Sequence, residues 1–453
     1  MVDKRVTIGT ARVNITPPLS IPYLGIVPRQ DYFTGVHDPL WAKAWVVDDG
    51  ETSVAIITAD AIGFSNQILG PGRNFTAEVR ERVQALTGIP AQNVMLAASH
   101  AHSTPETINL TRLLDVPAAR PWLEVLKEQL ASAAAWAANQ RRAGTLKVGV
   151  GKAEGIGWNR RILGRDGRLY HYYNRPPDDQ IVRWGERDPT VGVLLFEGED
   201  GTCSVLSNFT CHPTTVQVQP LVSADYPGAA TALVEQAMPG CTACLFTQGA
   251  GGNVNPVRGT TDFADVARYG LILGGEILQV VGRLRAPEVE PEPARVAVAA
   301  ASVALPVRDL PPLEPAQAAY ERAQEAVRQA RTEEEKRGAR LALKRAWDEL
   351  DLIQRGSEPL PAEVQVLWLG RAALVAVPGE LFVEFGLEIK ARSPAPQTLV
   401  VGYANDYLGY IVTPETFTEG GYEASLGPWT RVGPAGGGMV VEKAIELLQA
   451  SSP

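Results

Sequence analysis

The stretch "AKAWVVDDGETSVAIITAD", residues 42–60, decides the fold class. It holds two mostly apolar runs of strand length, rich in Val, Ile and Ala, on either side of an Asp-Asp-Gly turn. Such a turn is typical of a connection between neighbouring antiparallel strands. Because few polar residues interrupt either run, we expect both strands to be largely buried.

Helical patterns alternate with further strand-like runs. Residues 74–88, "NFTAEVRERVQALTG", predict a helix that stops at Gly88, and residues 93–99, "NVMLAAS", predict a buried strand. Residues 121–144 predict an amphipathic helix with cations in its last turn and Gly144 directly after it. This alternation predicts an α/β protein with mixed, largely buried β-sheets flanked by helices.

A charged segment interrupts the α/β pattern late in the chain. Residues 314–355 predict two helices with a charged break near residues 334–338, which favours a solvated helical hairpin over a lid or a partner-binding element. Chemically capable residues occur from position 100 to position 422. We therefore expect one domain, residues 1–453, with a helical insertion at about 311–358.

Composition excludes several classes of protein. The formal charge of −9 and the absence of a Lys/Arg-rich block argue against nucleic-acid binding. The longest apolar stretch, residues 296–307, is too short and too rich in Ala to span a bilayer, so we expect no integral membrane association. The charged N-terminus has no apolar core of a signal peptide, which predicts a cytoplasmic protein.

The chain has four cysteines, at positions 203, 211, 241 and 244. The last two form the motif "CTAC", whose spacing suits a redox or metal-binding pair. A single CxxC without a second pair is a weak signal, however. We expect buried, reduced thiols.

Several buried-looking strands end in residues that can do chemistry. The strand at 93–99 leads into His100 and His102, although the chain has only five histidines. Other predicted strands lead into His212, Glu380 and the pair Tyr407 and Tyr410. Sites in α/β proteins gather beyond strand ends, and two histidines with one carboxylate are a common zinc ligand set.

Simpler explanations exist for each of these residues. A lone histidine such as His212 is often a hydrogen-bonded structural residue. Glu380 follows Pro-Gly at the start of a predicted helix, where a carboxylate complements the helix dipole. Tyr410 and Tyr422 are also compatible with core aromatics whose hydroxyls are satisfied. No HExxH motif decides between these explanations and a metal site.

Five motifs together favour a metal site over these structural explanations. They are "GTARVNITPP" (9–18), "SHAHSTP" (99–105), "NFTCHPTTV" (208–216), "GNVNP" (252–256) and "GYANDYLGYIVTPETFTEGGYEA" (402–424). In this order they resemble the catalytic domain of the neutral (alkaline, non-lysosomal) ceramidase family over nearly the whole chain. The resemblance implies a zinc amidohydrolase that cleaves the N-acyl bond of ceramide, with one zinc ion per chain.

The resemblance also implies roles for individual residues. The zinc ligands carried over are His100, His212, Glu380 and Tyr410. His102 is carried over as the general base and acid. Because residues two apart in an extended chain point to one side, His100 can hold the metal while His102 faces its water.

The remaining catalytic roles come from other segments. Tyr422 and Arg160, the Arg of "WNRR", are carried over as catalytic residues, although Arg161 replaces the family's Ser. Asp60 and Asp225 are candidates to orient ligand histidines from behind, or to serve in turns or caps.

Three departures from the family bear on substrate. Asn255 stands where the family's Gly-rich loop carries a Ser, so it can hydrogen-bond a substrate but cannot act as a nucleophile. "TPET" replaces a Gly-Pro-Gly-Gly-type segment, which predicts that Thr104 and Glu106 reshape the pocket mouth. The chain ends at 453, and we expect it to lack the family's C-terminal immunoglobulin-like domain.

These observations predict a zinc-dependent amidohydrolase acting on a small-molecule N-acyl compound. Ceramide and a smaller, more soluble N-acyl compound are both candidate substrates. The alternatives are a zinc-dependent ester or lactone hydrolase and a non-catalytic ligand-binding relative. The sequence leaves the oligomeric state open.

Overall fold

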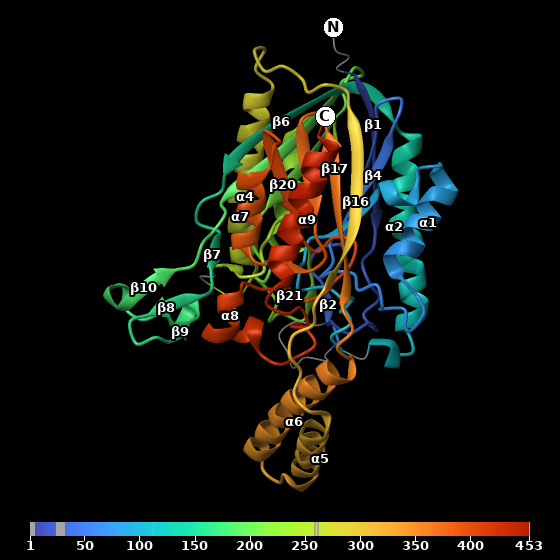
Figure 1. The fold of residues 1–453 in the computed structure, drawn as a ribbon. Helices are drawn as coiled ribbons and strands as arrows, with labels where there is room; N and C mark the ends of the chain where they lie inside the picture. The colour runs from blue at the N-terminus through green and yellow to red at the C-terminus, as the bar shows by residue number, and fades with distance from the viewer. Residues whose placement is uncertain (1–4, 24–31, 112, 258–259, 261, 453) are drawn as a thin grey trace.

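The computed structural model describes residues 5–23, 32–111, 113–257, 260 and 262–452. The chain start on which the cytoplasmic prediction rests includes residues 1–4 and so falls partly outside this range. The described residues form four layers, with helices on the outer face of each of two stacked sheets (Figure 1). The predicted α/β class, with mixed and largely buried sheets flanked by helices, is confirmed.

The main sheet has eight strands and the second sheet has four. The main-sheet strands are β1 (Val6–Asn14), β3 (Trp41–Asp48), β4 (Ser53–Ala59), β5 (Val94–Ala98), β6 (Arg142–Lys152), β11 (Thr190–Gly198), β12 (Cys203–Phe209) and β14 (Cys241–Gln248). Their order across the sheet is β14-β12-β11-β6-β1-β3-β4-β5. The second sheet contains, in spatial order, β16 (Val296–Leu305), β17 (Leu360–Leu369), β18 (Ala372–Ala376) and β20 (Gln397–Val401).

Shorter strands form small sheets near one end of the layers. One has three strands, β10 (Ile181–Trp184), β8 (Ile162–Gly164) and β9 (Leu169–Tyr170). The two-stranded pairs are β2 (Gly35–Val36) with β13 (Leu221–Val222), β7 (Gly157–Asn159) with β15 (Val254–Pro256), and β19 (Glu380–Leu381) with β21 (Tyr410–Ile411).

The helices vary from one turn to about six turns. The α-helices are α1 (Phe75–Thr87), α2 (Ala119–Asn139), α3 (Asp225–Ala237), α4 (Phe263–Leu284), α5 (Leu313–Gln329), α6 (Glu333–Gln354), α7 (Val383–Arg392), α8 (Pro414–Glu419) and α9 (Gly436–Ser451). The 3-10 helices are η1 (Ala91–Asn93), η2 (Leu113–Asp115), η3 (Tyr172–Asn174), η4 (Asp178–Gln180) and η5 (Tyr422–Ala424). Among the described helices, none is long and apolar enough to cross a membrane.

Strand β3 shows why the sheets are buried on both faces. Ala44 and Val46 belong to the hydrophobic cluster under α1 and α2, whereas Trp45 and Val47 belong to the cluster between the two sheets. Side chains alternate across a strand, so an almost wholly apolar strand buries both faces. As the Asp-Asp-Gly turn predicts, β3 pairs antiparallel with β4, with Val46 opposite Ala55.

Parallel strand pairs set the position of the candidate site. The pairs β4–β5, β12–β14 and β18–β20 are all parallel. His100 follows β5, His212 follows β12 and Glu380 follows β18. Each of the three residues therefore lies just beyond the carboxyl end of a strand, where sites in α/β sheets gather.

The predicted helix at 121–144 is shorter at its C-terminal end than the sequence pattern indicates. Helix α2 ends at Asn139, and Arg142 already pairs with Ile8 in the main sheet. Gly144 lies inside β6, where an added Cβ would lie 2.2 Å from the carbonyl oxygen of Glu197. Gly144 is therefore required by strand packing rather than by a helix end, and sheet pairing has overridden the helical pattern.

The segment 314–355 forms an antiparallel pair of helices, α5 and α6, that projects from one end of the layers (Figure 1). The break between them lies at residues 330–332, not at the predicted 334–338. Thr332 begins α6 with a capping box in which it and Glu335 bond each other's backbone N–H. The charged residues 334–338 thus belong to the first turns of α6.

The four cysteines are free, as the interpretation of the "CTAC" motif predicts. Cys203, Cys211 and Cys244 are buried and Cys241 is half-buried. All four pack in the hydrophobic cluster between the main sheet and helices α3 and α4. Their role in the fold is apolar packing.

Gly9 allows α2 to pack closely on the main sheet. An added Cβ there would lie 1.8 Å from the carbonyl oxygen of Ala137. We predict that Gly9→Ala lowers the free energy of unfolding by about 1–3 kcal/mol or more, because the helix must shift. Gly275→Ala in α4, with no atom within 4 Å of the added Cβ, should instead stabilise by about 0.5–1 kcal/mol. Urea unfolding of the two variants measures both changes. Equal changes in the free energy of unfolding would contradict the close packing at Gly9.

Candidate metal centre

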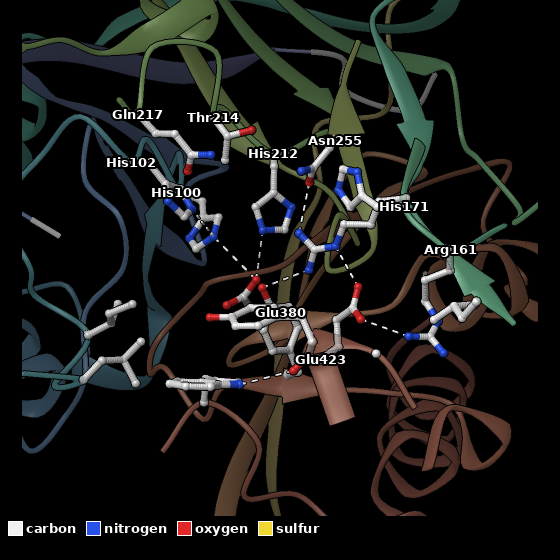
Figure 2. A pocket seen from close by; sticks show the side chains of 18 of the residues that line it. His100, His102, Arg161, His171, His212, Thr214, Gln217, Asn255, Glu380 and Glu423 are labelled. Carbon is white, nitrogen blue, oxygen red and sulfur yellow. Dashed lines mark hydrogen bonds and ion pairs between the residues drawn. The ribbon is translucent and has the colours of Figure 1, made fainter. Parts of the chain in front are cut away.

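A cavity of about 450 Å³ lies beyond the ends of β5, β12 and β18. We call it the histidine pocket. Its lining includes His100, His102, His212, Glu380, Tyr407 and Tyr410 (Figure 2). The structure therefore brings together residues that lie more than 300 positions apart in the chain.

The rings of His100 and His212 are each fixed by a backbone carbonyl group. Nδ1 of His100 donates to the carbonyl oxygen of Ile62 at 2.6 Å, and Nδ1 of His212 donates to that of Gly251 at 2.6 Å. Both side chains are 1% exposed. Because a carbonyl oxygen can only accept, Nδ1 carries the proton, and a neutral ring presents its lone pair at Nε2.

The unprotonated Nε2 atoms of His100 and His212 converge on the carboxylate of Glu380. Its Oε2 atom lies 3.0 Å from Nε2 of His212 and 3.5 Å from Nε2 of His100. Burial lowers the pKa of His212 to about 4, which keeps its ring neutral near pH 7. Burial acts to raise the pKa of Glu380, whereas positive charge on His100 and hydrogen bonds from the two rings lower it well below its ordinary value. With both rings neutral, a bound cation would supply that positive charge.

This geometry fits a bound cation. A neutral Nε2 and an ionised carboxylate are both acceptors, so their close approach is satisfied when a cation lies between them. His102 also approaches, with its Nε2 3.2 Å from that of His100. The ligand atoms of His100, His102 and His212 all lie within 4.8 Å of one another, a group that could hold a metal ion.

The proximity of His100 and His102 has a different cause from the predicted one. The extended chain predicted for this segment is wrong, since β5 ends at Ala98 and His100 lies in the left-handed region with φ of 66°. His102 is then held by its own N–H, which donates to the carbonyl of Pro213 at 3.2 Å. A sharp turn, rather than strand alternation, makes the rings meet.

Two tyrosines complete the walls around the histidines. The hydroxyl of Tyr407 donates to Oε1 of Glu380 at 2.6 Å and so fixes the carboxylate. The Tyr403 ring stacks on His100, with centroids 4.0 Å apart. Sequence reasoning noted Tyr407 only as a tyrosine after a strand and missed Tyr403, because neither contact is encoded by local spacing.

Arg160 links Tyr410 to the glycine-rich loop. Its Nη2 atom donates to the hydroxyl of Tyr410 at 2.9 Å, and its Nη1 atom donates to Oδ1 of Asn255 at 3.1 Å. Its Nε atom donates to Glu423 at 2.7 Å, forming a buried ion pair that Arg161 also joins at 2.9 Å. Sequence reasoning missed Glu423, whose carboxylate pairs with both arginines.

Tyr422 lies at the open side of the pocket. Its side chain is 50% exposed, and its ring meets that of Tyr410 edge-on at 5.9 Å. It also stacks on Trp429, with ring centroids 5.2 Å apart. The structure thus brings Tyr422 beside Tyr410 and Arg160, as the carried-over roles require, while its part in catalysis stays a prediction.

Asp60 and Asp225 do not orient the ligand histidines, so that hypothesis is wrong. The Nδ1 partners of both rings are backbone carbonyls, and neither aspartate lines the histidine pocket. Asp60 accepts a hydrogen bond from the Trp41 N–H at 2.9 Å. Asp225 accepts those of Val216 and Tyr226 and fixes the loop after His212, in agreement with the alternative turn role.

The four-layer fold and the buried histidine–carboxylate pocket define a protein with a candidate metal centre at one end of its stacked sheets. The profile of the family described as "Neutral/alkaline non-lysosomal ceramidase, N-terminal" matches residues 6–261, more than half of the sequence. The chain belongs to this family, and the resemblance seen in its motifs is confirmed.

Individual relatives agree with this assignment. The chain is 31% identical over 113 residues to neutral ceramidase of Drosophila pseudoobscura pseudoobscura, and 30% identical over 120 residues to that of Drosophila melanogaster. These segments cover 24% and 26% of this chain, and only 15% and 16% of the relatives' lengths.

Solved structures share the fold across nearly the whole chain. Neutral ceramidase from Pseudomonas aeruginosa superimposes with a TM-score of 0.72 at 18% identity, covering 99% of this chain and 74% of that one. A structure described as "Ceramidase complexed with C2" gives 0.71 at 17% identity, covering 99% and 75%. At these identities the likeness establishes the fold alone.

Asp60 should make stability depend on pH. Burial raises its pKa from the ordinary 3.8 to about 7, although Lys43 opposes this. Between these two pH values the Asp60 carboxyl keeps its proton in the folded state but loses it in the unfolded state. The free energy of unfolding therefore falls as the pH rises from about 4 to about 7.

We therefore predict that Asp60→Asn, which keeps an acceptor for Trp41, gains stability relative to the native chain across this window. The gain should reach a plateau above about pH 7. Urea unfolding at several pH values measures it. A difference that stays constant with pH would contradict the raised pKa.

Proposed function

We propose that this protein is a zinc-dependent amidohydrolase that cleaves the N-acyl bond of a small molecule, as a ceramidase does. The observation that carries the proposal is the convergence of Nε2 of His100, Nε2 of His212 and Oε2 of Glu380 on one point, with both Nδ1 atoms already bonded to carbonyls. Membership of the ceramidase family supports the same reaction class.

The donor set suits zinc. Imidazole nitrogen and carboxylate oxygen are common zinc ligands, and catalytic zinc sites usually use three protein ligands and keep one position open. His100, His212 and Glu380 would hold the ion and leave a position for water or substrate, and the Tyr410 hydroxyl in the same pocket is a candidate additional ligand. When bound, zinc would polarise the substrate carbonyl and make water acidic enough to attack near neutral pH.

His102 is placed to move protons. Its ring is only half-buried, unlike those of His100 and His212, and it faces the pocket with Nε2 close to the proposed ligands. It can take the proton of the attacking water and deliver one to the leaving amine. General acid–base catalysis of this kind typically contributes about 10²–10⁴-fold to the rate.

Tyr422 and Arg160 have separate tasks in this proposal. The hydroxyl of Tyr422, a half-exposed residue of the pocket lining, would donate a hydrogen bond to the oxyanion that forms from the substrate carbonyl, worth roughly 10²–10³-fold. Arg160 is bonded to Tyr410, Asn255 and Glu423, so it positions the pocket wall. Asn255 is available on that wall to hydrogen-bond the substrate.

The pocket has a polar and an apolar side. Asn255, His171, Arg161 and Glu423 lie together on one side of His212 and Glu380 (Figure 2). Other parts of the lining are apolar, with Ile108, Leu110 and Trp429. We propose that the acyl chain binds the apolar side and the amine portion the polar side, an arrangement open to ceramide and to smaller N-acyl compounds.

The test compares amide and ester hydrolysis by the zinc-loaded protein. N-acylsphingosine, short N-acyl amines and matched acyl esters are supplied, and released acid is measured by mass. We predict that His102→Ala lowers amide turnover by about 10²–10⁴-fold and ester turnover by less, because an alcohol leaving group needs less protonation. His37→Ala, outside the pocket, is the matched control.

Three outcomes would revise the proposal. Ester turnover without any amide turnover would identify an esterase. Equal loss on both substrates would remove the leaving-group role of His102. Absence of hydrolysis, with zinc bound, would indicate a ligand-binding relative.

A further inference from the structure

The projecting helix α6 contacts residues that line or adjoin the histidine pocket, through Lys344 and through Arg355 just after its end. Most of this helical pair is solvated, with Leu313 and Leu341 51% and 43% exposed. In α6 the buried residues are Asp348, Leu350 and Leu352, all in its C-terminal half. Lys344 in this half and Arg355 just after it each contact a different part of the pocket wall.

The first contact fixes the apolar wall. Arg355, just after α6, donates from Nη2 to the carbonyl oxygen of Asn109 at 2.7 Å and is itself held by Asp351 at 2.8 Å. Asn109 lies between Ile108 and Leu110, which both line the pocket.

The loop held by Arg355 is also tied from within the core. The buried carboxylate of Glu106 accepts the N–H groups of Ile108 and Leu110 at 3.0 Å each. Asn109 has φ of 60°, so the turn is in the left-handed region and depends on such support. The prediction that the "TPET" segment shapes the pocket mouth gains this physical basis.

The second contact fixes the wall beside Tyr422. Nζ of Lys344 in α6 lies between two indole rings, 5.7 Å from the centroid of Trp429 and 5.2 Å from that of Trp347 in its own helix, both within the range of a cation–π interaction. The Trp429 ring stacks on Tyr422 with an interplanar angle of 21°. Lys344 is oriented by the buried Asp348, one turn further along the helix.

We propose that α6 is a positioning element of the substrate pocket, in which Arg355 sets the apolar wall for the acyl chain and Lys344 holds Trp429 and Tyr422 in place. This inference rests on the proposed function, since it gives the pocket an acyl chain and Tyr422 a catalytic task. It assigns to the helical insertion a role in specificity and in rate.

The two contacts predict effects on different kinetic parameters for a short N-acyl amine. Arg355→Gln should raise KM about tenfold with kcat little changed, because the wall contacts the acyl chain in the bound ground state. Lys344→Gln should lower kcat about fivefold to tenfold with KM little changed, because the Tyr422 contact strengthens in the transition state. Lys344→Arg, which keeps the cation over Trp429, should restore kcat.

Lys336→Gln is the matched control, because Lys336 pairs with Glu333 at the far end of the same helix. It should change neither parameter. An equal loss of kcat/KM in Arg355→Gln, Lys344→Gln and Lys336→Gln would overturn the proposal. A kcat of Lys344→Arg no higher than that of Lys344→Gln would also overturn it.

A binding measurement separates this inference from the proposed reaction. Titration calorimetry with sodium octanoate on the zinc-free protein requires no turnover. We expect Arg355→Gln to weaken octanoate binding about tenfold, and Lys344→Gln and Lys336→Gln to leave it unchanged. Equal affinity of native and Arg355→Gln proteins, or no octanoate binding by the native protein, would overturn the inference even if amides are hydrolysed.

Discussion

The histidine pocket depends on two hydrogen bonds, from Nδ1 of His100 to Ile62 and from Nδ1 of His212 to Gly251. Each fixes a ring's tautomer and its orientation before any ligand arrives, so the cost of ordering the donors is met during folding. Both carbonyls come from loops that directly follow main-sheet strands, since Ile62 lies three residues after β4 and Gly251 three residues after β14. The convergence of Nε2 atoms on Glu380 follows directly.

Two residues at the histidine pocket have a strained backbone conformation. His100 and Tyr403 both have positive φ, of 66° and 55°, and their rings stack directly beyond the ends of β5 and β20. Such backbone costs about 1–3 kcal/mol per residue and persists only where the surroundings enforce it. Here two buried sheets supply that enforcement, and His100 and Tyr403 form part of the site.

The sequence predicted the parts of this molecule that local pattern controls. Apolar runs at β3, β4 and β5 and the stop at Gly88 follow from periodicity and turn chemistry. Positions after predicted strands pointed to His100, His212, Glu380 and Tyr410, and the family resemblance then implied their roles as ligands. The features that the sequence did not predict depend on tertiary contacts. The end of α2 is set by pairing of Arg142 with Ile8. The contacts of Glu423 with Arg160 and of Arg355 with Asn109 join residues more than 200 positions apart, and even the bond from Tyr407 to Glu380 spans 27 positions. The family profile ends at residue 261, so Glu380 and Tyr410 are placed by the fold itself.

The central claim is that His100 and His212 are neutral Nδ1–H tautomers whose Nε2 atoms are the proposed metal ligands. Because the chain has only five histidines, a long-range proton–nitrogen correlation spectrum of histidine-labelled protein can resolve them, with His→Gln variants for assignment. The account predicts that these two rings show the Nδ1–H pattern without metal, and that one equivalent of zinc shifts their Nε2 resonances. Nε2–H tautomers in the zinc-free protein, or zinc-induced shifts at Nδ1, would contradict it.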